Sequence, residues 1–186
     1  GGMGESSVTA PIVRDFHADM GWSLAGADEP FWGAVYRKAF PNLVSTELCT
    51  DMPRQKQGID RLLHLSNGKT LTIDEKKRDA VYNDILLEVL SNEEYNTPGW
   101  IEKDLSIDYL AYAFMPIKRC YLFPWPMLRR AWFQYGGKWQ ADYKHKRAQT
   151  QVGNATYHTV NVPVPIDVLR RAVSLAAVID LNTVAA

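Results

Sequence analysis

Between residues 43 and 90 the chain alternates short apolar runs with polar turns, and this pattern constrains the fold more than any other feature. Short runs rich in β-branched residues and bounded by turn residues are typical of strands. Asn67-Gly68, between two of the runs, supplies the positive φ angles that tight hairpin turns require. We therefore predict that residues 59–65 and 70–77 are adjacent antiparallel strands. The predicted strands of this region are 43–49, 59–65, 70–76 and 85–90.

Helical signals flank these strands. Asp28 is suited to an N-cap and Pro30 to the first helical position, and apolar residues then recur at helical spacing until Pro41. Later in the chain, Pro126 opens a second helical pattern. The further predicted elements are strands 107–115 and 119–123, with 109–114 also open to a helical interpretation, a helix over 127–135, a strand over 157–162 and an amphipathic helix over 166–181. This order predicts an α/β fold with a mixed central β-sheet flanked by helices.

Composition places the chain among globular proteins. Its 186 residues are 46% hydrophobic, which suits one domain, predicted over residues 11–186 after a flexible tail at 1–10. The 21 Lys+Arg residues balance the 21 Asp+Glu residues, so any nucleic-acid site must come from local clustering. Cys49 and Cys120 lack zinc or disulfide spacing and favour a reducing, cytoplasmic location. No apolar stretch is long enough to predict a membrane span.

Charged residues gather on the two strands of the predicted hairpin. Asp60 lies on the first strand, and Asp74-Glu75-Lys76-Lys77 ends the second. An aspartate and an acid-x-Lys triplet on neighbouring strands can converge at one end of a sheet. Carboxylates are the hard oxygen ligands that Mg²⁺ prefers, and a nearby ammonium can position water or offset charge on a phosphate. The pattern therefore indicates phosphoryl chemistry with a divalent metal.

In these residues the chain resembles the PD-(D/E)xK nuclease superfamily, which includes type II restriction enzymes and Holliday-junction resolvases. The match covers residues 28 to about 90, with Asp28 and Glu29 at the start of the leading helix, although no proline precedes Asp60. The resemblance implies a restriction-endonuclease-like fold and a nuclease that uses Mg²⁺ or Mn²⁺. Its implied metal ligands are Asp60 with Asp74 or Glu75, and its implied catalytic lysine is Lys76 or Lys77.

Two acid-x-Lys pairs satisfy the motif, because Asp74 with Lys76 and Glu75 with Lys77 both fit. Strand alternation puts Glu75 and Lys77 on the face of the apolar Ile73, and puts Asp74 and Lys76 on a polar face. We prefer Asp74 and Lys76 as the catalytic pair, and Glu75 stays a candidate ligand. Arg78 follows on the polar face as a phosphate contact, and Asp84 or Glu88 on the next strand is a further candidate metal ligand.

Residues 118–147 are rich in both cations and aromatic rings. They hold eight Lys+Arg residues against the single acid Asp142, together with eight aromatic residues. This mixture suits phosphate neutralisation and base stacking, although Trp132 and Phe133 on a helix also suit a core. Four consecutive basic residues cannot all be buried, so this run is a candidate DNA contact. The predicted contacts from the run are Lys144, Lys146 and Arg147.

The tryptophan and histidine patterns are less specific. Trp100, in a Pro-Gly loop, can either pack on the sheet or stack a base. The four histidines show no metal-binding spacing, which argues against a histidine-metal enzyme. The leading hypothesis is a DNA nuclease, with a homodimer left open. The alternatives are a non-catalytic nucleic-acid-binding protein and a protein-interaction factor on the same fold.

Overall fold

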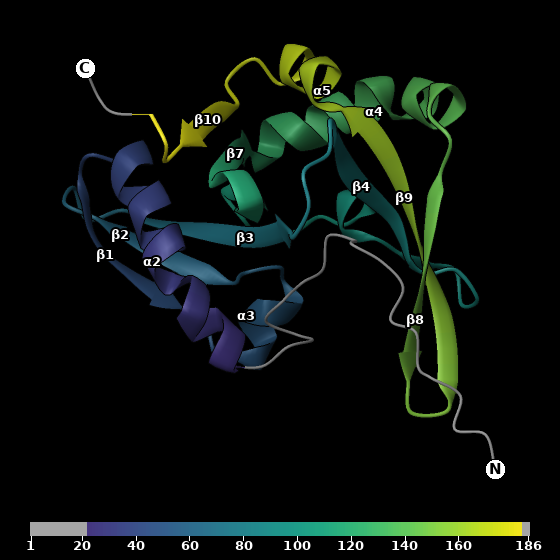
Figure 1. Cartoon of the computed structure of the whole chain (residues 1–186), viewed down its shortest axis with the longest axis horizontal. Coiled ribbons are helices and arrows are strands. Elements are labelled where there is room, and N and C mark those ends of the chain that lie inside the picture. The colour runs from purple at the N-terminus through teal and green to yellow at the C-terminus, as the bar shows by residue number, and fades with distance from the viewer. Residues whose placement is uncertain (1–21, 184–186) are drawn as a thin grey trace.

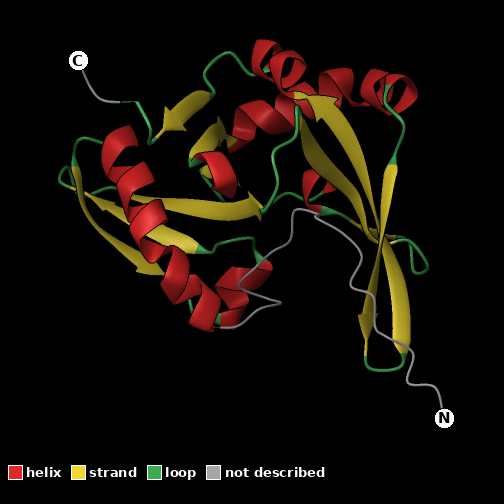
Figure 2. Cartoon of the chain, in the orientation of Figure 1, coloured by secondary structure: helices red, strands yellow, loops and turns green. Residues whose placement is uncertain are grey.

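The computed structural model describes residues 22–183, and side chains from Asp28 onward. Two β-sheets form its framework, and the helices pack against them (Figures 1 and 2). The helices are α2 (Trp22–Ala39), α3 (Met52–Lys56), α4 (Trp125–Asp142) and α5 (Ile166–Ala172), with short 3₁₀ turns η1 (Trp100–Glu102) and η2 (Met115–Ile117). The strands are β1 (Leu43–Leu48), β2 (Arg61–Leu65), β3 (Thr70–Arg78), β4 (Asp84–Asn92), β5 (Thr97–Pro98), β6 (Tyr109–Phe114), β7 (Arg119–Pro124), β8 (Lys146–Val152), β9 (Ala155–Pro165) and β10 (Ala177–Asp180).

The central sheet is mixed and has the strand order β1-β2-β3-β6-β7-β10. Strands β1, β2 and β3 form an antiparallel meander, and β6 then pairs with β3 in the parallel direction. In the predicted hairpin, Arg61 lies opposite Ile73 and Leu63 opposite Leu71, so the predicted antiparallel pair is confirmed. Gly68 in its turn has a φ of 85°, as an Asn-Gly turn requires. The mixed α/β class with flanking helices is also as predicted.

A second, four-stranded sheet lies beside the central one, in the order β5-β4-β9-β8. The mixed central sheet was predicted, but this second sheet was not, because β4 pairs with β9 and not with the meander. Leu87 on β4 lies opposite Val162 on β9, far along the chain. Local sequence pattern carries no information about such a distant partner. Strands β8 and β9 continue as a two-stranded ribbon that extends away from the rest of the protein (Figure 1).

Two hydrophobic cores form on opposite sides of the central sheet. Helix α2 packs Trp32, Val35 and Tyr36 on one side, together with Ile73 of β3. The other side packs against the second sheet, α4 and α5, and includes Ile85 of β4. The central sheet is thus covered on both sides, so both faces of β3 lie inside the protein.

The ends of several helices differ from the prediction. Helix α2 begins at Trp22, so Pro30 lies inside it and does not open it. Burial of one face of the helix against the sheet stabilises it despite the backbone hydrogen bond that a proline removes. Helix α4 continues beyond residue 135, to Asp142.

The C-terminal prediction of one helix over 166–181 is also wrong. Helix α5 stops at Ala172, and β10 then pairs antiparallel with the edge of β7. Strand β8 was likewise not predicted. The predicted tail at 1–10 lies outside the described residues, and among those described no helix is long and apolar enough to cross a membrane.

Candidate metal and catalytic site

The charged run that ends β3 is buried. Asp74, Glu75, Lys76, Lys77 and Arg78 all have little exposed surface, although a charged strand end is usually solvated. Because side chains alternate along a strand, they divide between the two covered faces of the central sheet. Burying this many charges requires charged or polar partners on both faces of the sheet. The partners on the α2 side differ from those on the side of the second sheet.

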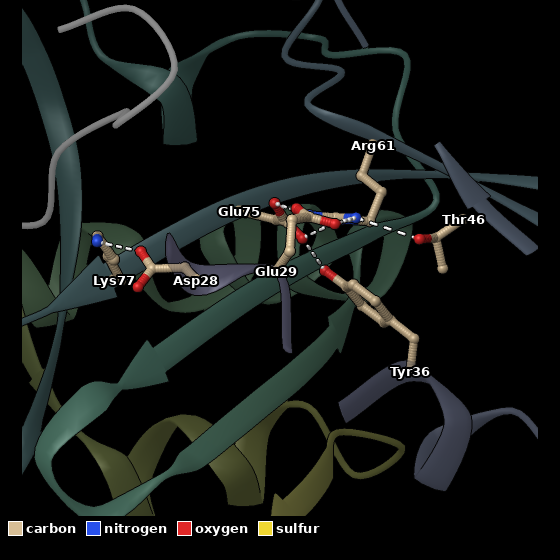
Figure 3. Close-up of polar contacts among 7 residues, drawn as sticks. All are labelled: Asp28, Glu29, Tyr36, Thr46, Arg61, Glu75 and Lys77. Atoms are coloured by element: carbon tan, nitrogen blue, oxygen red, sulfur yellow. Dashed lines mark hydrogen bonds and ion pairs between the residues drawn. The ribbon is translucent and has the colours of Figure 1, made fainter. Parts of the chain in front are cut away.

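On the α2 side, a guanidinium joins carboxylates from two elements (Figure 3). Arg61 has no exposed surface, and its Nε donates to Glu75 Oε2 at 2.7 Å. Its Nη atoms donate to both carboxylate oxygens of Glu29 and, at 3.3 Å, to Thr46 Oγ1. The Tyr36 hydroxyl also donates to Glu75. We call these five residues the Arg61 network.

Electrostatics explain how this network tolerates burial. Burial opposes the charge on the Arg61 guanidinium, but the adjacent Glu75 and Glu29 outweigh that cost and raise its pKa. Burial, followed by the neighbouring Glu75 charge, raises the pKa of Tyr36, so its hydroxyl stays protonated and donates. On the same side Lys77 forms an ion pair with Asp28 of α2. Glu29 and Glu75 therefore share the Arg61 guanidinium, and Asp28 pairs with Lys77, so each of these carboxylates lies beside a cation, as a buried charge requires.

The opposite side of β3 faces the second sheet. Lys76 Nζ lies 3.2 Å from an oxygen of Asp74 and 5.7 Å from the centre of the Trp100 ring. Glu88 of β4 also belongs to this side and accepts a hydrogen bond from the backbone N–H of Trp100. Burial raises the pKa of Glu88, the positive charge of Lys76 opposes that shift, and the negative charge of Asp74 adds to it. Asp74, Lys76 and Glu88 thus act on one another electrostatically.

Asp60 lies where β2 and β3 begin to separate. Its Oδ2 accepts the backbone N–H of Glu75 at 2.7 Å, and because a strand N–H points along the plane of the sheet, the carboxylate lies between the two faces. Gly58, with a φ of 85°, turns the chain just before it. A Cβ at Gly58 would lie 3.3 Å from Asp74 Oδ2. Glycine therefore lets the backbone pass close to the Asp74 carboxylate, where a larger residue would crowd it.

We call Asp60, Asp74, Lys76 and Glu88 the Asp74 cluster. Three of its four residues are carboxylates and one is a lysine; the Arg61 network likewise holds two carboxylates, Glu29 and Glu75, against the single cation Arg61. Grouped carboxylates repel one another unless a cation offsets them, and hard oxygen donors suit Mg²⁺ or Mn²⁺. The donor chemistry of the Asp74 cluster suits a divalent ion, while among the described residues the three side chains whose ligand atoms all lie within 4.8 Å of one another are Glu93, Glu94 and His158.

The other predicted contacts lie elsewhere. Arg78 is buried, with Nη1 2.8 Å from Asp84 and its guanidinium 3.6 Å from the centre of the Tyr82 ring. Asp84 therefore lies with Arg78 and not with Asp74. Lys144 is exposed just before β8, whose first two residues are also exposed. Lys146 lies 3.5 Å from Asp84, and Arg147 pairs with Glu93.

Sequence reasoning missed several residues. Arg61 and Tyr36 carried no motif, although an arginine on a strand facing an acid on its neighbour was a usable signal. Glu93, Glu94 and His158 form a group of possible metal ligands whose ligand atoms are all within 4.8 Å of one another. Glu93 in this group already forms an ion pair with Arg147.

The burial of Trp100 and the exposure of Phe133 decide between the packing and base-stacking alternatives that the sequence left open. Trp100 is buried, so it packs and does not wedge between bases, whereas Phe133 is exposed and not part of the core.

No protein-family model matches the sequence, and neither the search of curated proteins nor that of solved structures found a match. The functional argument therefore depends on the site itself.

Proposed function

We propose that the protein is a metal-dependent phosphodiesterase, with the Asp74 cluster as its active site. More particularly, we propose that it is a nuclease that hydrolyses DNA phosphodiesters. The observation that carries the proposal is the buried Asp74–Lys76 pair on one face of β3, with Glu88 of β4 close enough to act on both charges. The order of a leading helix, a three-stranded meander and a parallel fourth strand supports the restriction-endonuclease-like resemblance.

Each member of the cluster has a role in this proposal. Asp60 and Asp74 would hold Mg²⁺ or Mn²⁺, with Glu88 completing the oxygen set. When bound, the ion supplies Lewis-acid polarisation of the scissile phosphate and makes a water more acidic. Lys76, held beside Asp74 and over the Trp100 ring, orients the attacking water and offsets the charge that develops on the phosphate.

The α2 side has a supporting role. Glu75 and Lys77 also satisfy the acid-x-Lys motif, but their charges are engaged by Arg61 and Asp28. Glu75 accepts from both Arg61 and Tyr36, and Lys77 pairs with Asp28, so this pair suits a structural role. The Arg61 network fixes the backbone of β3 at Glu75, and hence the direction in which Asp74 and Lys76 point.

Matched lysine variants test the proposal. We expect Lys76→Ala to reduce cleavage at least ~100-fold, the lower range for a positioned catalytic group, while metal still binds. Asp74→Asn should abolish both the heat of Mg²⁺ binding and cleavage. Lys77→Ala is the control, because it alters the same strand on its other face, and it should be milder.

One outcome would contradict the choice of catalytic pair, and another would contradict the nuclease activity itself. If Lys77→Ala is the more damaging variant, Glu75 and Lys77 form the active pair. If the wild-type protein cleaves neither linear, branched nor single-stranded DNA with Mg²⁺ or Mn²⁺, the nuclease proposal fails and a non-catalytic nucleic-acid-binding protein takes its place.

A further inference from the structure

Phe133 is by far the most exposed aromatic ring of helix α4. The helix buries Leu128, Trp132 and Trp139 against the protein, but Phe133 is 75% exposed. A single exposed apolar side chain is common on protein surfaces, so exposure alone indicates nothing. The contacts around this ring are what make it unusual.

One side of the Phe133 ring is covered by Arg129, one turn earlier. The Arg129 guanidinium carbon lies 4.7 Å from the centre of the Phe133 ring and 5.9 Å from that of the buried Trp125. Arg129 also donates to the backbone oxygen of Ile101. The guanidinium is thus fixed between two rings, and it holds Phe133 in place on the surface.

On the other side of the Phe133 ring, the sequence places a glycine, which has no side chain to cover the ring. The residue one turn later is Gly137, and a Cβ there would meet no atom within 4 Å. On a helix, residues three and four apart are neighbours on the surface, so a side chain at position 137 would lie next to the Phe133 ring. Because glycine has none, a flat surface remains open beside Phe133.

The surroundings of this surface select its partner. Arg130, three residues before Phe133, is exposed and adds a second positive charge to this part of the helix surface. Cations beside an open aromatic face suit a nucleic-acid base stacked on the ring with its phosphate near the guanidinium. An apolar peptide would use the ring but not the two charges.

The same surface connects to the Asp74 cluster. Ile101, which accepts the Arg129 hydrogen bond, follows Trp100, and the Trp100 ring lies 6.4 Å from Trp125 and 5.7 Å from Lys76 Nζ. Two packed tryptophans therefore separate the exposed ring from the catalytic lysine.

We propose that Phe133, backed by Arg129, is a stacking platform for an unpaired base of the strand that enters the active site. This inference rests on the proposed nuclease function and deepens it, because it makes the substrate a nucleic acid with a single-stranded segment. Base-on-aromatic stacking depends on the π face and not on sequence, so the platform should accept any base.

Binding measured without cleavage tests the platform. Single-stranded DNA containing 2-aminopurine is titrated with the full chain in EDTA, and both fluorescence quenching and anisotropy are followed. We expect Phe133→Ala to weaken binding about 10-fold and to reduce quenching, and Phe133→Trp to restore both. Gly137→Leu should weaken binding to a similar degree while raising Tm, because leucine covers the ring and favours the helix.

Tyr95→Ala is the matched control, since Tyr95 is 84% exposed and lies in the turn after β4. It should leave binding unchanged. If Phe133→Ala and Gly137→Leu bind like wild type, or if wild type does not bind single-stranded DNA, the platform is refuted. A concentration-dependent dimer that Phe133→Ala dissolves would instead assign the surface to a second copy of the chain. Normal binding without any cleavage would refute the nuclease proposal alone.

Discussion

At the scale of single residues, the buried guanidinium of Arg61 decides whether the α2 side of β3 can fold. Two carboxylates from different elements converge on it, and neither can be solvated fully once α2 packs. A buried ion pair contributes little net stability against an apolar substitute, but loss of one partner leaves a charge buried alone. We therefore assign Arg61 a structural role and not a catalytic one.

Replacing Arg61 tests this assignment. We expect Arg61→Met to destabilise the protein by ~3–5 kcal/mol, because Glu75 keeps its burial and loses its guanidinium. Urea denaturation followed by circular dichroism measures the change. Glu29→Gln is the control, since the Glu29 side chain is 36% exposed and its loss should cost much less. Equal effects of the two substitutions would mean that Arg61 acts only through Glu29.

At the scale of elements, Gly58 and Gly68 offer a matched pair. Both glycines have a φ of 85°, which costs an L-residue ~1–2 kcal/mol. A Cβ at Gly68 meets no atom within 4 Å, whereas one at Gly58 would approach Leu105 to 3.0 Å and Asp74 to 3.3 Å.

We therefore expect Gly68→Ala to lower stability by ~1 kcal/mol with unchanged Mg²⁺ affinity. Gly58→Ala should lower stability more and also weaken Mg²⁺ binding, because the methyl group crowds the Asp74 carboxylate. Calorimetric titration of both variants separates these effects. If Gly58→Ala binds Mg²⁺ like wild type, Asp74 is not a ligand.

The elements also show how far sequence could predict the fold. The β2–β3 hairpin was predictable because a short turn and two alternating strands contain all of its information. Pairing of β4 with β9, and of β10 with β7, joins residues far apart in sequence, so no local pattern encodes it. The helix predicted over 166–181 failed for this reason, since the exposed edge of β7 provides hydrogen bonds that favour a strand at Ala177–Asp180.

The candidate site was predictable to the same extent. Alternation along β3 correctly separates Asp74 and Lys76 from Glu75 and Lys77. It could not indicate what covers each face, because that depends on α2 on one side and on the second sheet on the other. Arg61 as the neutralising partner, and Trp100 beside Lys76, appear only when these long-range contacts are known.

At the scale of the whole molecule, the Asp74 cluster connects the two sheets. Asp60, Asp74 and Lys76 belong to the central sheet and its β2–β3 junction, whereas Glu88 and Trp100 belong to the second sheet and the turn that follows it. The core between the sheets is shared by both. A cation that binds carboxylates from the two sheets would therefore hold them together.

This arrangement predicts that divalent metal stabilises the entire fold. A ligand that binds only the folded state adds about 2.7 kcal/mol at a concentration 100 times its Kd, so Mg²⁺ should raise Tm by several degrees for a chain of this size. Scanning calorimetry with Mg²⁺ and after EDTA treatment measures the shift. If both sheets supply ligands as proposed, Asp74→Asn and Glu88→Gln should each remove most of it, whereas Glu75→Gln should lower Tm but keep the shift. A Mg²⁺ shift that survives Glu88→Gln would confine the metal to the central sheet, and one that survives Asp74→Asn would remove it from this cluster.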